Sequence, residues 1–170
     1  GAILHDYGVI ANAGTGSVVY GVSPAGDARQ VGGWGHVLGD EGSAYDIAVA
    51  GLRAGARHFD GRGPYTLLVD TFPEALDVSD YIQVAFKLYG LNLSRTEIAA
   101  LAKVVAAAAR EGDEIADKIL IRAAEELALA VSVAIRELDV EEMDVPVSYA
   151  GSVFDSGKTI VQAFAAAVEK

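Results

Sequence analysis

The stretch Val9-Ile10-Ala11-Asn12-Ala13-Gly14-Thr15-Gly16-Ser17-Val18-Val19-Tyr20-Gly21 decides the fold that we expect for this chain. Two β-rich runs, at 9–13 and 18–22, meet at a turn that brackets hydroxyl side chains with glycines. Because glycine has no Cβ, backbone N–H groups in such a turn can approach an anion closely, and the hydroxyls add donors beside them. The turn therefore suits a phosphate or a sugar hydroxyl, although an ordinary β-hairpin would account for the same pattern.

Further short strands and several amphipathic helices follow this hairpin. A third strand is predicted near Gln30–Gly33 and a fourth at Val145–Tyr149. The predicted helices cover 41–59, short pieces between 65 and 89 that are interrupted at Pro73 and Gly90, then 94–112, 114–138 and 158–170. This order predicts an α/β fold, namely one ribonuclease-H-like lobe with an all-helical insertion at about 60–112.

Two helix starts carry strong local signals. Ser94 and Glu97 have the spacing of a capping box, in which each residue satisfies a backbone N–H near the other. Asp113 directly precedes the longest apolar repeat and is predicted to be its N-cap. Both helices are therefore expected to begin at these residues.

The composition describes a single domain of 170 residues that is 52% hydrophobic, enough for a sizeable core. With 13 basic and 24 acidic residues the formal net charge is −11, which argues against nucleic acid and anionic membranes as partners. The chain has no cysteine, so neither a disulfide framework nor a thiolate metal site is expected. No basic leader or bilayer-length apolar run is evident, so we expect a soluble cytoplasmic protein.

Three strings of the sequence are specific enough to suggest a family. They are AGTGS at 13–17, GGWGHVLGDEGSAY at 32–45 and VPVSYAGSVFDSG at 145–157. In this order they resemble the N-acetylglucosamine kinase and BadF/BadG-type ATPase family, in the sugar-kinase branch of the actin-like ATPase superfamily. The resemblance covers nearly the whole chain and implies an actin-type ATPase lobe. It also implies ATP and Mg²⁺ as cofactors and phosphorylation of a hexose or an N-acetylhexosamine.

On the nucleotide side, the resemblance implies contacts of the glycine turn with the terminal phosphates and of the later motif with adenosine. The implied nucleotide-binding residues are Gly14, Thr15, Gly16, Ala99, Gly151 and Ser152. Ser152 replaces the second glycine of the family pattern, and a serine is still small enough for a nucleotide to lie against the backbone. Thr15 could instead only close a β-turn, and Ala99 could be ordinary core.

On the sugar side, the resemblance implies contacts from the hairpin and from the glycine-rich middle string. The implied substrate-binding residues are Ser17, Val18, Gly33, Trp34, Gly35 and Asp40. A carboxylate such as Asp40 accepts hydrogen bonds from adjacent sugar hydroxyls, but Asp40 could also cap a helix starting near Glu41. Trp34 could equally be a packing residue.

The resemblance also exposes elements that this sequence does not show. The family's Asp-Gly-Gly-Thr hairpin, its catalytic Asp before the first string and its closing strand and helix have no match, and Asp6 does not fit the Asp motif. We therefore expect a C-terminal lobe over 1–170 with no catalytic residue of its own, an absent N-terminal lobe as partner, and a homodimer. His5, His36 and His58 lack metal-ligand spacing, so no metal site is expected.

Two other functions remain open at this point. The chain could be a non-catalytic sugar- or nucleotide-binding module. It could also be a BadF/BadG-type ATPase that activates another enzyme. Related activators hold an iron–sulfur cluster with cysteines, which this chain lacks.

Overall fold

A computed structural model describes residues 7–169, so that His5, Asp6 and Lys170 lie outside the described residues. Four strands form one sheet in the order β3-β2-β1-β4: β1 (Gly8–Ala13), β2 (Ser17–Val22), β3 (Ala28–Gly32) and β4 (Val147–Ala150). The first three pair antiparallel, whereas β4 runs parallel to β1, with Asn12 opposite Ala150. All four predicted strands are present, with ends shifted by up to two residues.

Seven α-helices and a short 3₁₀ turn complete the described part of the chain. They are α1 (Ala44–Phe59), α2 (Leu68–Ala75), α3 (Tyr81–Gly90), α4 (Arg95–Ala100), α5 (Ala102–Arg110), α6 (Glu114–Glu137), η1 (Phe154–Ser156) and α7 (Lys158–Val168). Between residues 7 and 169, no helix is both long and apolar enough to cross a membrane.

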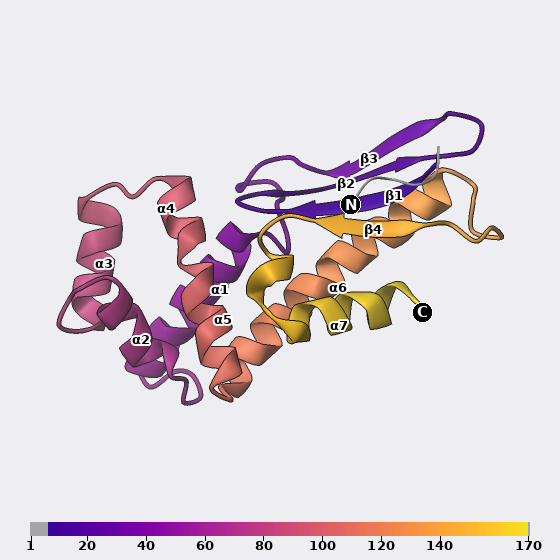
Figure 1. Ribbon diagram of the computed structural model, residues 1–170. Coiled ribbons are helices and arrows are strands. Elements are labelled where there is room, and N and C mark those ends of the chain that lie inside the picture. The colour runs from indigo at the N-terminus through magenta and orange to yellow at the C-terminus, as the bar shows by residue number, and fades with distance from the viewer. Residues whose placement is uncertain (1–6, 170) are drawn as a thin grey trace.

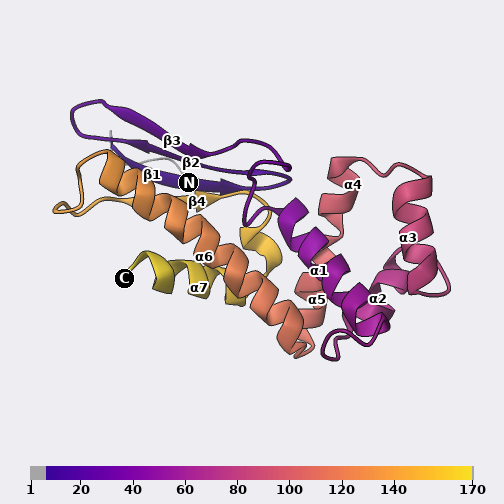
Figure 2. The ribbon, with the colours of Figure 1, turned by 180° about the vertical axis from the view of Figure 1, so that it is seen from behind.

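The sheet is covered by helices on one face only (Figures 1 and 2). Alternate residues of β1 point to that face, so that Val9, Ala11 and Ala13 are buried, as is Val19 of β2. The long helix α6 contacts β1, β2 and β3, and α7 packs beside α6. The first strands and the last helix therefore share one core.

Helices α1 to α5 form a second group beside the sheet (Figure 1). Helix α1 contacts α2, α3, α4 and α5, and its first turn lies next to the sheet. The segment predicted as an insertion, about 60–112, contains α2 to α5. The capping box of Ser94 and Glu97 and the N-cap role of Asp113 are both confirmed.

Three details of the predicted helices are wrong. Pro73 does not interrupt α2, which continues through this buried proline and forgoes the backbone hydrogen bond that a proline cannot donate. The predicted helix over 94–112 is divided at Leu101, which ends α4 and begins α5. Helix α1 begins at Ala44 and not at Glu41, because Gly42 has a φ of 73° and Ser43 supplies the N-cap.

Candidate functional site

The carboxyl ends of β1 and β4 meet the beginning of α1 at one end of the sheet. The turn after β1 closes through a hydrogen bond of 2.9 Å from the Gly14 N–H to the Gly16 carbonyl. The Ala44 N–H donates to the Gly14 carbonyl at 2.8 Å, and the Val153 N–H donates to the Ala13 carbonyl at 3.0 Å. The structure thus brings the first and the third sequence motifs together.

Gly151 is glycine because two pieces of backbone meet there. Its φ is 100°, and a Cβ added to it would lie 2.3 Å from the carbonyl oxygen of Ala13. No side chain can be accommodated at that distance. The glycine therefore lets the segment after β4 cross the end of β1, and Ser152 follows it on the exposed surface.

Asp40 is a buried carboxylate beside the hairpin turn. Only 4% of the residue is exposed, and its φ of 61° lies in the left-handed region. Its Oδ1 accepts a hydrogen bond of 3.2 Å from the Ser17 N–H. The alternative role as a helix cap is wrong, because Ser43 caps α1 by accepting from the Asp46 N–H at 3.2 Å.

The second oxygen of Asp40 faces a cation that sequence reasoning missed. Nη2 of Arg95, the first residue of α4, lies 3.0 Å from Asp40 Oδ2. In the sequence, Arg95 is recognisable only as a residue between Ser94 and Glu97 of the capping box, since nothing local links it to a residue 55 positions earlier. The pair joins the helical group to the edge of the sheet.

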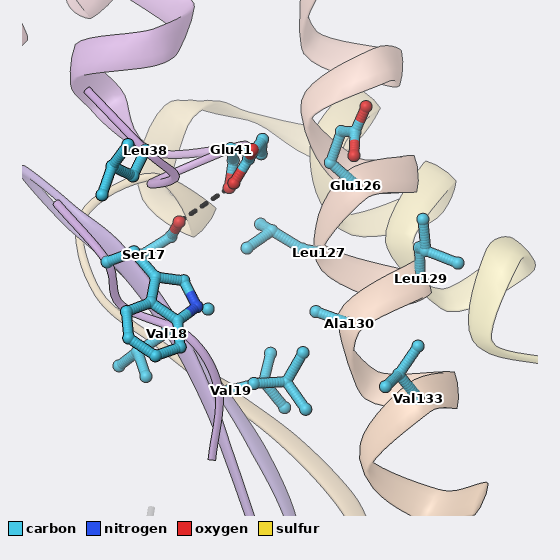
Figure 3. Close-up of a pocket in the computed structure, with 13 residues that line it drawn as sticks. Ser17, Val18, Val19, Leu38, Glu41, Glu126, Leu127, Leu129, Ala130 and Val133 are labelled. Carbon is cyan, nitrogen blue, oxygen red and sulfur yellow. Dashed lines mark hydrogen bonds between the residues drawn. The ribbon is translucent and has the colours of Figure 1, made fainter. Parts of the chain in front are cut away.

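A groove of about 260 Å³ lies between β2 and α6 (Figure 3), and its lining includes Ser17, whose N–H binds Asp40. Ser17, Val18, Trp34 and Glu41 line one side, and its opposite wall comes from α6. The Ser17 hydroxyl donates to the Glu41 carbonyl at 2.7 Å, which fixes the loop against β2 (Figure 3). Trp34 is 73% exposed, so the packing role considered for it is not what this chain shows.

The remaining expected residues lie at varying distances from this centre. A Cβ on Gly33 would lie 3.0 Å from Val18, so these two expected sugar positions are neighbours, whereas Gly35 borders open space. The Thr15 hydroxyl makes no hydrogen bond within the described residues. Ala99 is buried on α4, one turn after Arg95.

Ionisable side chains at this end of the sheet do not form a metal centre. Within residues 7–169, no three His, Asp or Glu side chains are grouped so that they could hold an ion. His36 instead contacts the Tyr45 ring edge-on, with a centroid distance of 5.0 Å, and His58 contacts Tyr65 in the same way at 5.2 Å. Both histidines therefore have local packing contacts.

Comparison with known proteins places the fold and these motifs in one family. The sequence profile of the BadF/BadG/BcrA/BcrD ATPase family matches residues 2–170. The chain belongs to this family. The family resemblance seen in the three sequence motifs is thereby confirmed.

Two curated proteins are similar to this chain in sequence. An N-acetylmuramic acid/N-acetylglucosamine kinase of Clostridium acetobutylicum is 35% identical over 156 residues, covering 92% of this chain and 51% of that protein. An N-acetyl-D-glucosamine kinase of Dictyostelium discoideum is 33% identical over 149 residues, covering 85% of this chain and 46% of that protein. The chain thus spans about half the length of the curated relatives it matches.

Two solved structures share the fold. A putative N-acetylglucosamine kinase from Chromobacterium violaceum superposes with a TM-score of 0.73 at 24% identity, over 94% of this chain and 59% of that one. A second, from Porphyromonas gingivalis, gives a TM-score of 0.67 at 17% identity, over 96% and 52%. The predicted actin-type ATPase lobe is confirmed.

Proposed function

We propose that this chain is the C-terminal lobe of an ATP-dependent sugar kinase that phosphorylates a hexose or an N-acetylhexosamine. The observation that carries the proposal is the ionic, buried Asp40, held by the Ser17 N–H and by Arg95 beside the glycine turn. A structure that buries a carboxylate beside a glycine turn needs a reason beyond stability, since such burial is costly. Recognition of a polar, uncharged ligand supplies that reason.

The sugar would lie over Asp40 and the first residues of β2. Each carboxylate oxygen has two acceptor sites, so Oδ1 can accept from a sugar hydroxyl as well as from the Ser17 N–H. Hydrogen bonds to a charged acceptor are about twice as strong as neutral ones, which favours a ligand rich in hydroxyls. The exposed Trp34 and the backbone of Gly33 and Gly35 would border the ring. The names of the curated relatives support an amino sugar as substrate.

ATP would bind where β1 and β4 end. A Cβ at Gly14 would meet no atom within 4 Å, so the Gly14 end of the turn has open space for terminal phosphates, whereas Arg95 and Asp40 occupy the space at Gly16. The Thr15 hydroxyl, which has no hydrogen bond within the described residues, would be a donor to these phosphates. Gly151 and Ser152 would lie against adenosine, and Ala99 near the adenine. Mg²⁺ would arrive with ATP, where it neutralises charge on the transferring phosphoryl group.

The wider assembly is also part of this proposal. An N-terminal lobe would supply the catalytic base and the other half of the phosphate site, and two copies would pair as a homodimer in the cytoplasm. The match to about half of each curated relative supports a second lobe.

The test is phosphorylation by the full-length protein, with N-acetylglucosamine, N-acetylmuramic acid, glucose and glycerol as trial substrates. Asp40→Asn should raise the sugar KM by tens- to hundreds-fold, equivalent to about 2–3 kcal/mol, because the charge-assisted hydrogen bonds weaken. Asp27→Asn, in the turn between β2 and β3, is the matched control and should leave the sugar KM unchanged. A preference for glycerol, sugar binding without turnover, or an unchanged sugar KM for Asp40→Asn would overturn the proposal.

A further inference from the structure

We propose that Arg95 is a positioning residue, which holds Asp40 in the orientation that binds the sugar and ties that orientation to the helical group. The inference rests on the proposed function of Asp40. Arg95 does not need to touch the substrate, because its effect would pass through the carboxylate.

The two oxygens of Asp40 have different partners. Oδ1 receives the Ser17 N–H, and Oδ2 faces only Arg95 Nη2, at 3.0 Å. Oδ2 is buried and has no hydrogen-bond donor of its own within the described residues. Among the described residues, the Arg95 guanidinium is the cation that offsets the charge of Oδ2, while the Ser17 N–H holds Oδ1.

The ion pair of Arg95 and Asp40 occupies the space beside Gly16. A Cβ on Gly16 would lie 2.3 Å from Arg95 Nη2 and 2.9 and 3.0 Å from the two carboxylate oxygens. Gly16 thus leaves room for the pair directly above the turn that would face the phosphates. The turn, Asp40 and Arg95 consequently form one packed unit.

The start of helix α4 and its packing place Arg95 beside Asp40. The capping box of Ser94 and Glu97 fixes the first turn of α4, in which Arg95 is the first residue. Helix α4 packs on α1, whose N-cap follows Asp40 by three residues. The Arg95 side chain is 39% exposed as a whole, but its Nε is buried and, among the described residues, has no hydrogen-bond partner. A displacement of α4 would therefore move the partner of Asp40.

The experiment compares Arg95→Gln and Arg95→Lys in the full-length protein by steady-state kinetics. Arg95→Gln should raise the sugar KM by about tenfold or more, because Asp40 loses its orienting charge. The guanidinium also lies beside Gly16 of the turn proposed to face the phosphates, so a rise in the ATP KM larger than the rise in the sugar KM would indicate a phosphate-binding role instead and would overturn the inference. Arg95→Lys keeps the positive charge but not the planar guanidinium. Its sugar KM should therefore lie between the sugar KM of the unsubstituted protein and that of Arg95→Gln. Arg29→Gln is the matched control, since Arg29 makes an exposed ion pair at the same distance of 3.0 Å with Glu137.

A double-mutant cycle shows whether Arg95 acts through Asp40. In an Asp40→Asn background, Arg95→Gln should raise the sugar KM by less than about twofold, because the carboxylate it would position is gone. Additive losses, an unchanged sugar KM for Arg95→Gln, or a lowered sugar KM that would make Arg95 a blocking residue each overturn the inference. If Arg95→Gln does not fold, Arg95→Lys decides by the same criterion.

The cycle also separates this inference from the proposed function. An unchanged sugar KM for Asp40→Asn alone would defeat the sugar role of Asp40 and with it both proposals. A raised sugar KM for Asp40→Asn, together with an unaffected Arg95→Gln enzyme, would defeat only the positioning role.

Discussion

Single residues at the end of the sheet are constrained by backbone contacts more than by their own chemistry. Gly151 combines a φ of 100° with a Cβ position 2.3 Å from the Ala13 carbonyl oxygen, whereas Gly26 has a similar φ of 91° and no atom within 4 Å. Alanine substitutions at these two glycines therefore separate two free-energy costs. One is the cost of a positive φ, and the other is the cost of a steric contact.

Gly151→Ala should reduce the free energy of unfolding by about 2–4 kcal/mol, because the added methyl group pushes the segment after β4 away from β1. In Gly26→Ala, only the positive φ is unfavourable for the new side chain. The free energy of unfolding should therefore fall by about 1–2 kcal/mol. Urea denaturation of both variants measures the difference. Equal losses would show that the β1–β4 crossing tolerates a side chain.

At the scale of elements, Asp113 joins two helices that are far apart in sequence. Its Oδ1 caps α6 by accepting from the Ala116 N–H at 2.8 Å, and its Oδ2 accepts from the Thr66 hydroxyl at 2.8 Å and from the Leu67 N–H ahead of α2. Both Asp113 and Thr66 are buried. One carboxylate thus satisfies donors of two elements.

Asp113→Ala should reduce the free energy of unfolding by about 3 kcal/mol, from the lost cap and from the buried donors left without an acceptor. Asp80→Ala removes the exposed N-cap of α3, which serves only that helix, and should cost clearly less. Denaturant titration of the two variants tests the ranking. A larger loss for Asp80→Ala would contradict the role of Asp113 as a link.

The capping box of α4 predicts a pH dependence. Hydrogen bonds from the Ser94 hydroxyl and the Ser94 N–H lower the pKa of Glu97 from its ordinary value of 4.5. Because the folded pKa is the lower one, the stabilisation is present above pH 4.5 and disappears as the pH falls through the folded value. The Tm of Glu97→Gln should be below that of the unsubstituted chain at pH 7, and this difference should shrink toward pH 3. Glu142→Gln, in an exposed loop, is the control.

At the scale of the whole molecule, β3 and β4 are the two edge strands of the described sheet, and each pairs on one side only. Strand β4 pairs with β1 on one side, and no strand within residues 7–169 lies on its other side. Unpaired edges promote association, while a net charge of −11 opposes indiscriminate aggregation. We therefore predict a defined dimer of the 170-residue chain.

Light scattering over a concentration series should show this dimer, and added salt should strengthen it, because screening weakens the repulsion between like-charged copies. A monomeric mass at high micromolar concentration, with and without salt, would contradict the prediction.

The sequence by itself determined those features that depend on neighbouring residues. The alternation in 9–13 and 18–22 and the caps at Ser94 and Asp113 predicted their elements because backbone hydrogen bonding in a hairpin or a helix start is local. The three motifs predicted the family and the actin-type lobe. They also indicated Asp40, but left its role divided between a ligand and a helix cap.

Only the tertiary structure decided which distant residues meet. Helix α2 continues through Pro73, although the local sequence favours a break there. Helix α4 ends at Leu101, although the local sequence favours a continuous helix. We attribute both differences to tertiary packing. Arg95 reaches Asp40, and Gly151 crosses Ala13, through contacts whose partners lie far away along the chain. Such contacts have no periodic signature, because they depend on the relative placement of whole elements. For this reason the ion pair at the candidate sugar site is a property of the fold and not of any motif.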